Sequence, residues 1–221
     1  MGEKIMKLHL GCGQVYLEDY INIDFPPSKH TVQKKSFADE HKDLLTLSYQ
    51  KEIIDEVRLH HVFEHFIRPV ALGLLASWHS WLKIGGTVHI EVPDFDRTAR
   101  LVLSRFTPDN EKKVALRHIF GSNEAEWATH YEGWSEKRLT EVFEIIGFKI
   151  DNTIKGGYKA TRNISVVGTK CNKSLSQNKL ESSVRSYLKD FLVDKNDAME
   201  KELLSVWMKD FTSQYNKTKA K

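Results

Sequence analysis

The strongest constraint on the fold comes from residues 7–24, where two short apolar segments flank a glycine turn. The first segment ends at Gly11-Cys12-Gly13, and the second ends on the acidic residue Asp24. Glycine is favoured where a backbone turns sharply or lies against a ligand. If both segments are strands of a parallel sheet, Asp24 lies one strand away from the turn, where it can accept hydrogen bonds from a ribose diol. The pattern therefore predicts a nucleoside-binding site.

Strand and helix patterns alternate through the rest of the first 170 residues. A buried strand is predicted over 53–62, a helix over 70–82 with Pro69 in its first turn, and a strand over 87–93. Two helices within 97–121 and a helix over 136–146 that ends at Gly147 follow. The segments 148–150 and 164–168 then form an antiparallel hairpin. This order predicts an α/β, doubly wound, Rossmann-like sheet.

The last fifty residues have a different pattern, which divides the chain into a domain over 1–170 and an extension over 171–221. Apolar residues recur there at three- and four-residue spacing in two groups, and Asp197 and Glu200 between them have the spacing of a helix cap. A helical hairpin is therefore expected. Its apolar stripes should be buried on the body or in a homodimer; they are Leu180, Val184, Tyr187, Leu188, Phe191 and Leu192 in the first helix and Met199, Leu203, Trp207 and Phe211 in the second.

Composition limits the partners and the compartment. The net charge of +3 lies in the extension, which has 10 Lys/Arg and 7 Asp/Glu, whereas the first 170 residues have 23 of each. Without a clustered basic face no nucleic-acid partner is expected. No apolar run reaches the roughly 18–20 residues of a membrane span, and no signal-peptide pattern is present, so no membrane partner is expected. Two cysteines without metal or disulfide spacing favour the cytoplasm.

Several motifs, in this order, resemble those of class I S-adenosylmethionine-dependent methyltransferases. They are LHLGCG, the acidic residue of INID, DEVRLHHVFEHF, LKIGG before HIEVPDFD, and RHIFGS followed by HYEGWSEKRLTEVFEIIGF. Within that superfamily the chain is similar to the bacterial group with LNLGCG and HVLEHF motifs, which is often associated with polysaccharide biosynthesis.

The resemblance implies a cofactor, S-adenosyl-L-methionine, and a set of contacts to it. Gly11 and Gly13 would let the backbone approach the methionine part of the cofactor, with Cys12 packed beneath it. Asp24 would hold the ribose hydroxyls, and Asp43, or less favourably Asp39, would lie near the adenine. His61 would line the floor of the site beside the acceptor.

A dinucleotide-binding site competes for the same glycines. That fingerprint needs a third glycine, where this chain has Tyr16, and an acidic residue about twenty positions downstream, whereas Asp24 comes much sooner. Only residues 14–20 separate the first two strands, although a parallel crossover usually needs about a dozen residues. The first helix should therefore be reduced to about a turn, which disfavours a pyrophosphate site at a helix N-terminus.

The segment His61-Val62-Phe63-Glu64-His65 also matches H-x-x-E-H, a zinc-peptidase pattern. That chemistry needs both histidines on one helix face, but His61 should end a strand, and Pro69 should start the helix only after His65. No metal is therefore predicted. A divalent ion held by Glu64 and His65, or a role for both in capping the next helix, remain as alternatives.

The predicted reaction is methyl transfer to an oxygen or nitrogen of a polar metabolite or glycan precursor. His130 is the first candidate for the general base, with His118 and His61 as alternates, because a neutral imidazole can accept a proton near neutral pH. The competing hypothesis is a catalytically inactive binding or assembly module with the same fold.

Overall fold

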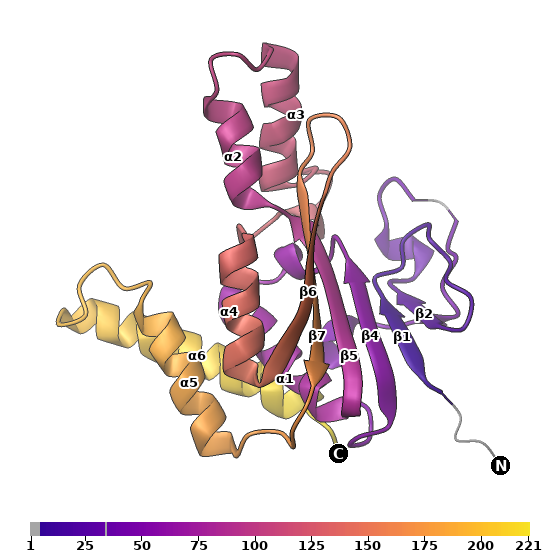
Figure 1. The fold of residues 1–221 in the computed structure, drawn as a ribbon, viewed down its shortest axis with the longest axis vertical. Coiled ribbons are helices and arrows are strands. Elements are labelled where there is room, and N and C mark those ends of the chain that lie inside the picture. Colours follow the sequence, from indigo (N-terminus) through magenta and orange to yellow (C-terminus); the bar gives the residue numbers. More distant parts are fainter. Residues whose placement is uncertain (1–4, 34) are drawn as a thin grey trace.

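A mixed seven-stranded sheet organises the chain in the computed structural model, which describes residues 5–33 and 35–221 (Figure 1). The strand order is β3-β2-β1-β4-β5-β7-β6, in which β1–β5 pair in parallel and β7 runs antiparallel to β5 and β6. This topology confirms the predicted fold class. The strands are β1 (Lys7–Leu10), β2 (Ile21–Asp24), β3 (Glu40–His41), β4 (Ile54–His60), β5 (Leu82–Pro93), β6 (Phe148–Gly156) and β7 (Asn163–Lys170).

The helices begin and end at local signals in the sequence. Pro69 lies in the first turn of α1, the Asp94 side chain accepts a hydrogen bond from the backbone N–H of Arg97 at the start of α2, and Gly147 ends α4 with a left-handed φ of 114°. The helices are α1 (Arg68–Trp81), α2 (Phe95–Leu103), α3 (Asp109–Phe120), α4 (Glu136–Ile146), α5 (Gln177–Lys189) and α6 (Ala198–Thr218). None of the described helices is long and apolar enough to cross a membrane.

One face of the sheet is apolar and lies under the helices. Figure 1 shows α1, α4, α5 and α6 together on that side. The side chains of Leu8, Val57 and Ile90 from three neighbouring strands are fully buried in the same core as Trp78 and Trp81 of α1. The two tryptophans are therefore core residues between α1 and the sheet.

The opposite face of the sheet carries polar side chains, including Arg58, His60 and His89. In the described residues, turns connect β1 to β2, and the connection from β2 to β3 contains only a 3₁₀ turn at Pro27–Lys29. The short first connection is as predicted. The predicted fold class thus holds, but in the described residues loops replace the helical layer that a doubly wound sheet carries on this face. Between β1 and β2 the reason is length, because the seven residues 14–20 are too few for a helical crossover.

The C-terminal helices pack on the body of the protein. Tyr215 and Phe211 of α6 lie in the common core, and the indole N–H of Trp81 donates to the Thr218 carbonyl (2.8 Å). At Gly73 of α1 an added Cβ would lie 3.0 Å from the Phe211 carbonyl of α6, so the lack of a side chain at Gly73 permits the two helices to pack closely. The predicted stripe is wrong at its start, because Met199 and Leu203 are exposed, whereas Leu204 and Met208 are buried.

Candidate functional site

A cavity of about 760 Å³ opens where the parallel strands β1, β2 and β4 end. Its lining comes from separate segments of the chain, which include the turn after β1, the end of β2, the loop after β3, the loop after β4 and residues between 117 and 131. Five of the six residues predicted to contact the cofactor line it: Gly11, Gly13, Asp24, Asp43 and His61.

The turn after β1 depends on both glycines. Gly11 has a φ of +67°, and a Cβ added there would lie 2.3 Å from Cγ2 of Val62. Gly13 has a φ of +55°, and its N–H donates to Oδ2 of Asp24 (2.7 Å). A direct hydrogen bond therefore joins the glycine turn to the acidic residue at the end of β2.

Asp24 is 7% exposed and faces the cavity. Its Oδ1 accepts a hydrogen bond from the N–H of Phe25 (2.7 Å) and lies 3.6 Å from Nε2 of His30, whose ring packs edge-on against Trp127. Each carboxylate oxygen can accept two hydrogen bonds, so Asp24 keeps capacity for the hydroxyl groups of a ligand.

Two other acidic residues in this region have different positions. Asp43 lines the cavity, and its Oδ1 accepts a hydrogen bond from the N–H of Leu45 at the start of a 3₁₀ turn. Asp39 instead accepts hydrogen bonds from the backbone N–H and the side-chain amide of Asn22. Of the two, Asp43 is the one positioned to contact a ligand.

Cys12 is the predicted cofactor contact that the structure does not place on the cavity wall. The side chain is 3% exposed, and burial, followed by the charges of Asp24 and Asp39, raises its pKa to about 12. The small thiol therefore stays protonated and fills space beneath the turn rather than acting as a nucleophile.

A second cavity of about 550 Å³ adjoins the first, and both are lined by His61, His65, Arg117, Ser122 and Trp127. The other walls come from α3, the loop before α4 and the β6–β7 hairpin. All three predicted catalytic histidines, His61, His118 and His130, line this second cavity. The structure thus places the candidate acid–base groups in the second cavity, next to the first cavity with its candidate cofactor contacts.

His61 lies between two carboxylates at the end of β4. Its Nδ1 is 3.3 Å from Oε1 of Glu64, and its Nε2 is 3.6 Å from Oε1 of Glu91. Burial alone would lower the pKa of His61, but the hydrogen bonds and charges of Glu64 and Glu91 raise it to about 9. At neutral pH His61 is therefore a cation and a poor proton acceptor.

His118 and His130 have the opposite electrostatic character. Burial lowers the pKa of both, so both rings are neutral at pH 7. Nε2 of His118 donates to the carbonyl of Arg162 (3.1 Å) and to Oδ1 of Asn163 (2.9 Å), which leaves Nδ1 with the free lone pair. A neutral imidazole held in one tautomer suits proton abstraction.

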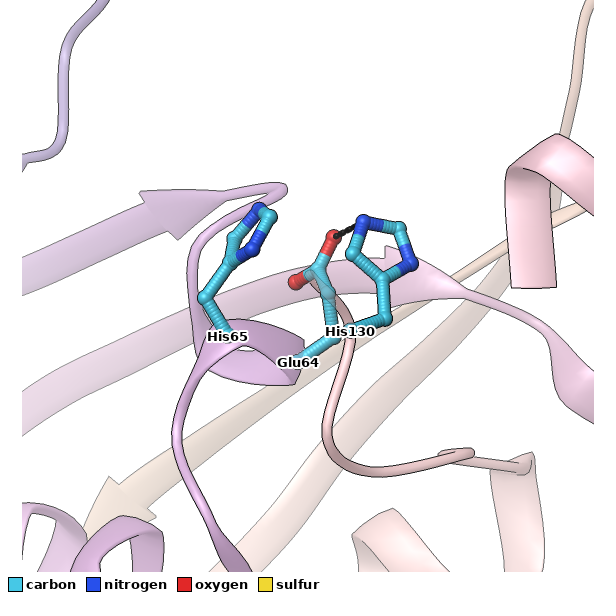
Figure 2. A group of neighbouring side chains, drawn as sticks. All are labelled: Glu64, His65 and His130. Atoms are coloured by element: carbon cyan, nitrogen blue, oxygen red, sulfur yellow. Dashed lines mark ion pairs between the residues drawn. The ribbon is translucent and has the colours of Figure 1, made fainter. Parts of the chain in front are cut away.

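Glu64, His65 and His130 form a cluster (Figure 2), and its two histidines line the second cavity. Burial alone would raise the pKa of Glu64, but the hydrogen bond and charge of His61 lower it, so the buried carboxylate is ionised. Neither Glu64 nor His65 caps α1, whose N-cap is Ile67. The structure also lacks the helical histidine pair of the zinc-peptidase pattern, since His61 follows strand β4.

Sequence reasoning missed other residues of the cavity walls. Asn163 at the start of β7 donates through Nδ2 to Oε1 of Glu91 (3.0 Å) and lines the second cavity. Arg117 and Trp127 line both cavities. A single polar residue at the start of a strand, such as Asn163, has no periodic pattern by which it could be predicted. The aromatic residues of the 123–134 loop, in contrast, could have indicated that Trp127 lines a binding site.

Comparison with solved structures relates this arrangement to known folds. A SAM-dependent methyltransferase from Methanosarcina mazei aligns with a TM-score of 0.51 at 14% identity, over 77% of this chain and 94% of the other. The chain has the class I methyltransferase fold. No protein-family model matches the sequence, and no curated protein does.

Two further methyltransferase structures are similar over the same part of the chain. An S-adenosylmethionine-dependent methyltransferase from Mesorhizobium loti has a TM-score of 0.50 at 12% identity, over 76% of this chain and 93% of the other. The 1,6-didemethyltoxoflavin-N1-methyltransferase of Burkholderia thailandensis, solved with 1,6-didemethyltoxoflavin and S-adenosylhomocysteine, has a TM-score of 0.51 at 13% identity, over 76% and 71%. At these levels of sequence identity the similarity shows a common fold and does not identify the methyl acceptor.

Proposed function

We propose that the protein is an S-adenosylmethionine-dependent methyltransferase. The observation that carries this proposal is the convergence of Gly11, Gly13, Asp24 and Asp43 on one cavity at the carboxyl edge of a methyltransferase-type sheet. The glycine turn provides a wall without side chains, Asp24 provides acceptors for a ribose diol, and Asp43 provides an acceptor for an adenine amino group. One of the similar structures contains S-adenosylhomocysteine, the product of this cofactor.

A dinucleotide is a poorer fit to the same cavity. The described residues between β1 and β2 form no helix, so the turn after β1 leads to no helix N-terminus that could bind a pyrophosphate. The position of the third glycine is taken by Tyr16, which is exposed. A sulfonium cofactor without phosphate needs neither feature.

The proposed reaction is one in-line displacement. The bond between the cofactor methyl carbon and sulfur breaks as a bond from that carbon to the acceptor oxygen or nitrogen forms, and the acceptor proton passes to a base. S-adenosylhomocysteine and the methylated acceptor are the products. Most of the acceleration comes from holding the two reactants in line, which two adjoining cavities can do.

We assign the base to a neutral histidine of the second cavity, either His118 or His130. His61, held between Glu64 and Glu91, is assigned to the wall between cofactor and acceptor. Arg117, Ser122 and Asn163 give the second cavity a polar lining, which favours an oxygen- or nitrogen-rich acceptor such as a polar metabolite or glycan precursor. A cytoplasmic location and a homodimer remain proposals from the sequence.

Turnover tests the proposal. The purified protein is incubated with S-adenosylmethionine and pooled sugar nucleotides or cell extract, and release of S-adenosylhomocysteine is measured. We expect acceptor-dependent release, and His118→Ala or His130→Ala should reduce it by about 10²–10⁴-fold, the usual effect of losing a general base. Cofactor binding without turnover on any pool would instead favour the non-catalytic module. Full turnover in both variants would contradict histidine base catalysis.

A further inference from the structure

Glu64 carries an unusual charge for a side chain in its position. It is 1% exposed, and its Oε2 has no hydrogen-bond partner in the described part of the chain. Its nearest side-chain nitrogens are Nδ1 of the His61 cation at 3.3 Å and Nε2 of the neutral His130 ring at 3.9 Å. A buried carboxylate is costly unless it is hydrogen-bonded or coordinates a metal, so this side chain is poised for a further positive partner.

Two imidazoles face the same carboxylate. One potential ligand atom from each of Glu64, His65 and His130 lies within 4.8 Å of the others, and Figure 2 shows the three side chains converging. Nδ1 of His65 is 3.1 Å from the carbonyl of Thr129 and must donate to it, which leaves the Nε2 lone pair free. A backbone carbonyl that fixes the tautomer in this way is the usual second-shell partner of a metal-bound histidine.

The backbone holds the cluster together without help from a ligand. The N–H of Tyr131 donates to the carbonyl of Glu64 (2.9 Å), which fixes the loop carrying His130 to the turn carrying Glu64 and His65. The Glu132 carboxylate in turn forms ion pairs with Arg68 and Arg138, both at 2.7 Å. This hydrogen bond and these ion pairs therefore fix the relative positions of the two loops that carry the three candidate ligands.

We propose that Glu64, His65 and His130 bind one divalent transition-metal ion, with Zn²⁺ as the fitting probe. Two imidazole nitrogens and one carboxylate favour such an ion over Mg²⁺ or Ca²⁺, which prefer oxygen ligands. Ligands at about 2.1 Å from a tetrahedral ion lie about 3.4 Å apart, so the 3.9 Å between Glu64 and His130 needs only small side-chain rotations. Three protein ligands leave at least one coordination position open.

The open position gives the site a role in the proposed reaction, and this part of the inference rests on the proposed function. His65 lines both cavities and His130 lines the second, so the ion lies where the acceptor would bind. A hydroxyl oxygen bound to the ion would have a lowered pKa, and the ion would hold it for attack on the methyl carbon. The acceptor class is then an oxygen nucleophile, with His130 as a ligand and His118 receiving the proton.

Metal binding is measured without cofactor or acceptor, so it is independent of the methyltransferase assay. Protein stripped with a chelator and dialysed is titrated with Zn²⁺ by calorimetry, the bound metal is counted by mass spectrometry, and the Co²⁺ form is examined for ligand-field absorption. We expect one ion per chain and no binding of Mg²⁺ at the same concentration. Glu64→Gln, His65→Ala and His130→Ala should each weaken binding by more than the roughly 10–100-fold lost with an outer-shell partner.

His41→Ala is the matched control, because His41 is an exposed histidine that does not line either cavity. It should bind like the wild type, and so should His118→Ala, even if that variant has lost turnover. Failure of the wild type to bind Zn²⁺, or equal binding by the three ligand variants, would overturn the inference. If a ligand variant fails to fold, the Co²⁺ spectrum of the wild type still tests the site, because the inference expects the strong absorption of a four-coordinate ion and the weak absorption of a six-coordinate, water-bound ion would overturn it.

Discussion

Gly11 is a residue of the candidate cofactor site that the structure does not allow to be replaced without strain. Its backbone is left-handed, and the space that a side chain would need is filled by Val62. Both restrictions arise at the point where the chain leaves the first strand and forms the wall of the cavity. One position therefore couples the stability of the turn to the shape of the candidate cofactor site.

Gly11→Ala is expected to lower the free energy of unfolding by about 2–5 kcal/mol, since backbone strain of about 1–3 kcal/mol adds to overpacking against Val62. Chemical denaturation measures the loss. Gly85→Ala is the matched control, because Gly85 also has a positive φ of 87° but no atom within 4 Å of an added Cβ. The double change Gly11→Ala with Val62→Ala should recover the steric part. Equal losses at Gly11 and Gly85 would show that the contact with Val62 is unimportant.

At the scale of single elements, sequence periodicity located helices and strands well where burial follows local spacing. The helix predicted over 70–82 is α1, because Leu74, Trp78 and Trp81 recur at helical spacing and Pro69 marks its first turn, although the structure buries almost every residue of this helix. The start of β5 was predicted five residues too late. Gly85 and Gly86 suggested a helix stop, but pairing of Leu82 with Ile54 of β4 already extends the strand across them.

Helix α6 shows the same limit of prediction from sequence spacing. Met199, Leu203, Trp207 and Phe211 form one periodic stripe in the sequence, yet the buried face of α6 is centred on Leu204, Met208, Phe211 and Tyr215. Which face is buried depends on where α1 offers space, and Gly73 offers it beneath Phe211. The buried face of α6 is therefore determined by tertiary packing and cannot be predicted from the spacing of apolar residues alone.

Phe211→Ala should therefore destabilise the whole protein rather than a detached tail. Phe211 is fully buried, so the expected loss in the free energy of unfolding is about 3–5 kcal/mol. Met199→Ala on the same helix is the control and should change stability by less than about 0.5 kcal/mol, since Met199 is 82% exposed. Thermal unfolding of both variants checks this. A melting temperature unchanged by Phe211→Ala would mean that α6 does not belong to the common core.

At the scale of the whole molecule, the functional groups and the stabilising layer occupy different places. The helices α1, α4, α5 and α6 cover one face of the sheet (Figure 1). Both cavities instead lie at the carboxyl edge of the sheet. The glycine turn and Asp24 could be predicted because they are close in sequence. The cluster of Glu64, His65 and His130 could not, because a loop 65 residues after His65 supplies its third member.

The measurement that tests the central proposal most directly is calorimetric titration of the wild type and Asp24→Ala with S-adenosylmethionine, S-adenosylhomocysteine and NAD. The wild type should bind the first two and not NAD. Asp24→Ala should bind both about 10–150-fold more weakly, which corresponds to losing about 1.5–3 kcal/mol of hydrogen bonding to a charged group. The melting temperature of each protein without ligand reports whether the fold is intact. A wild type that binds neither methionine cofactor, or an intact Asp24→Ala with unchanged affinity, would contradict the assignment of this cavity.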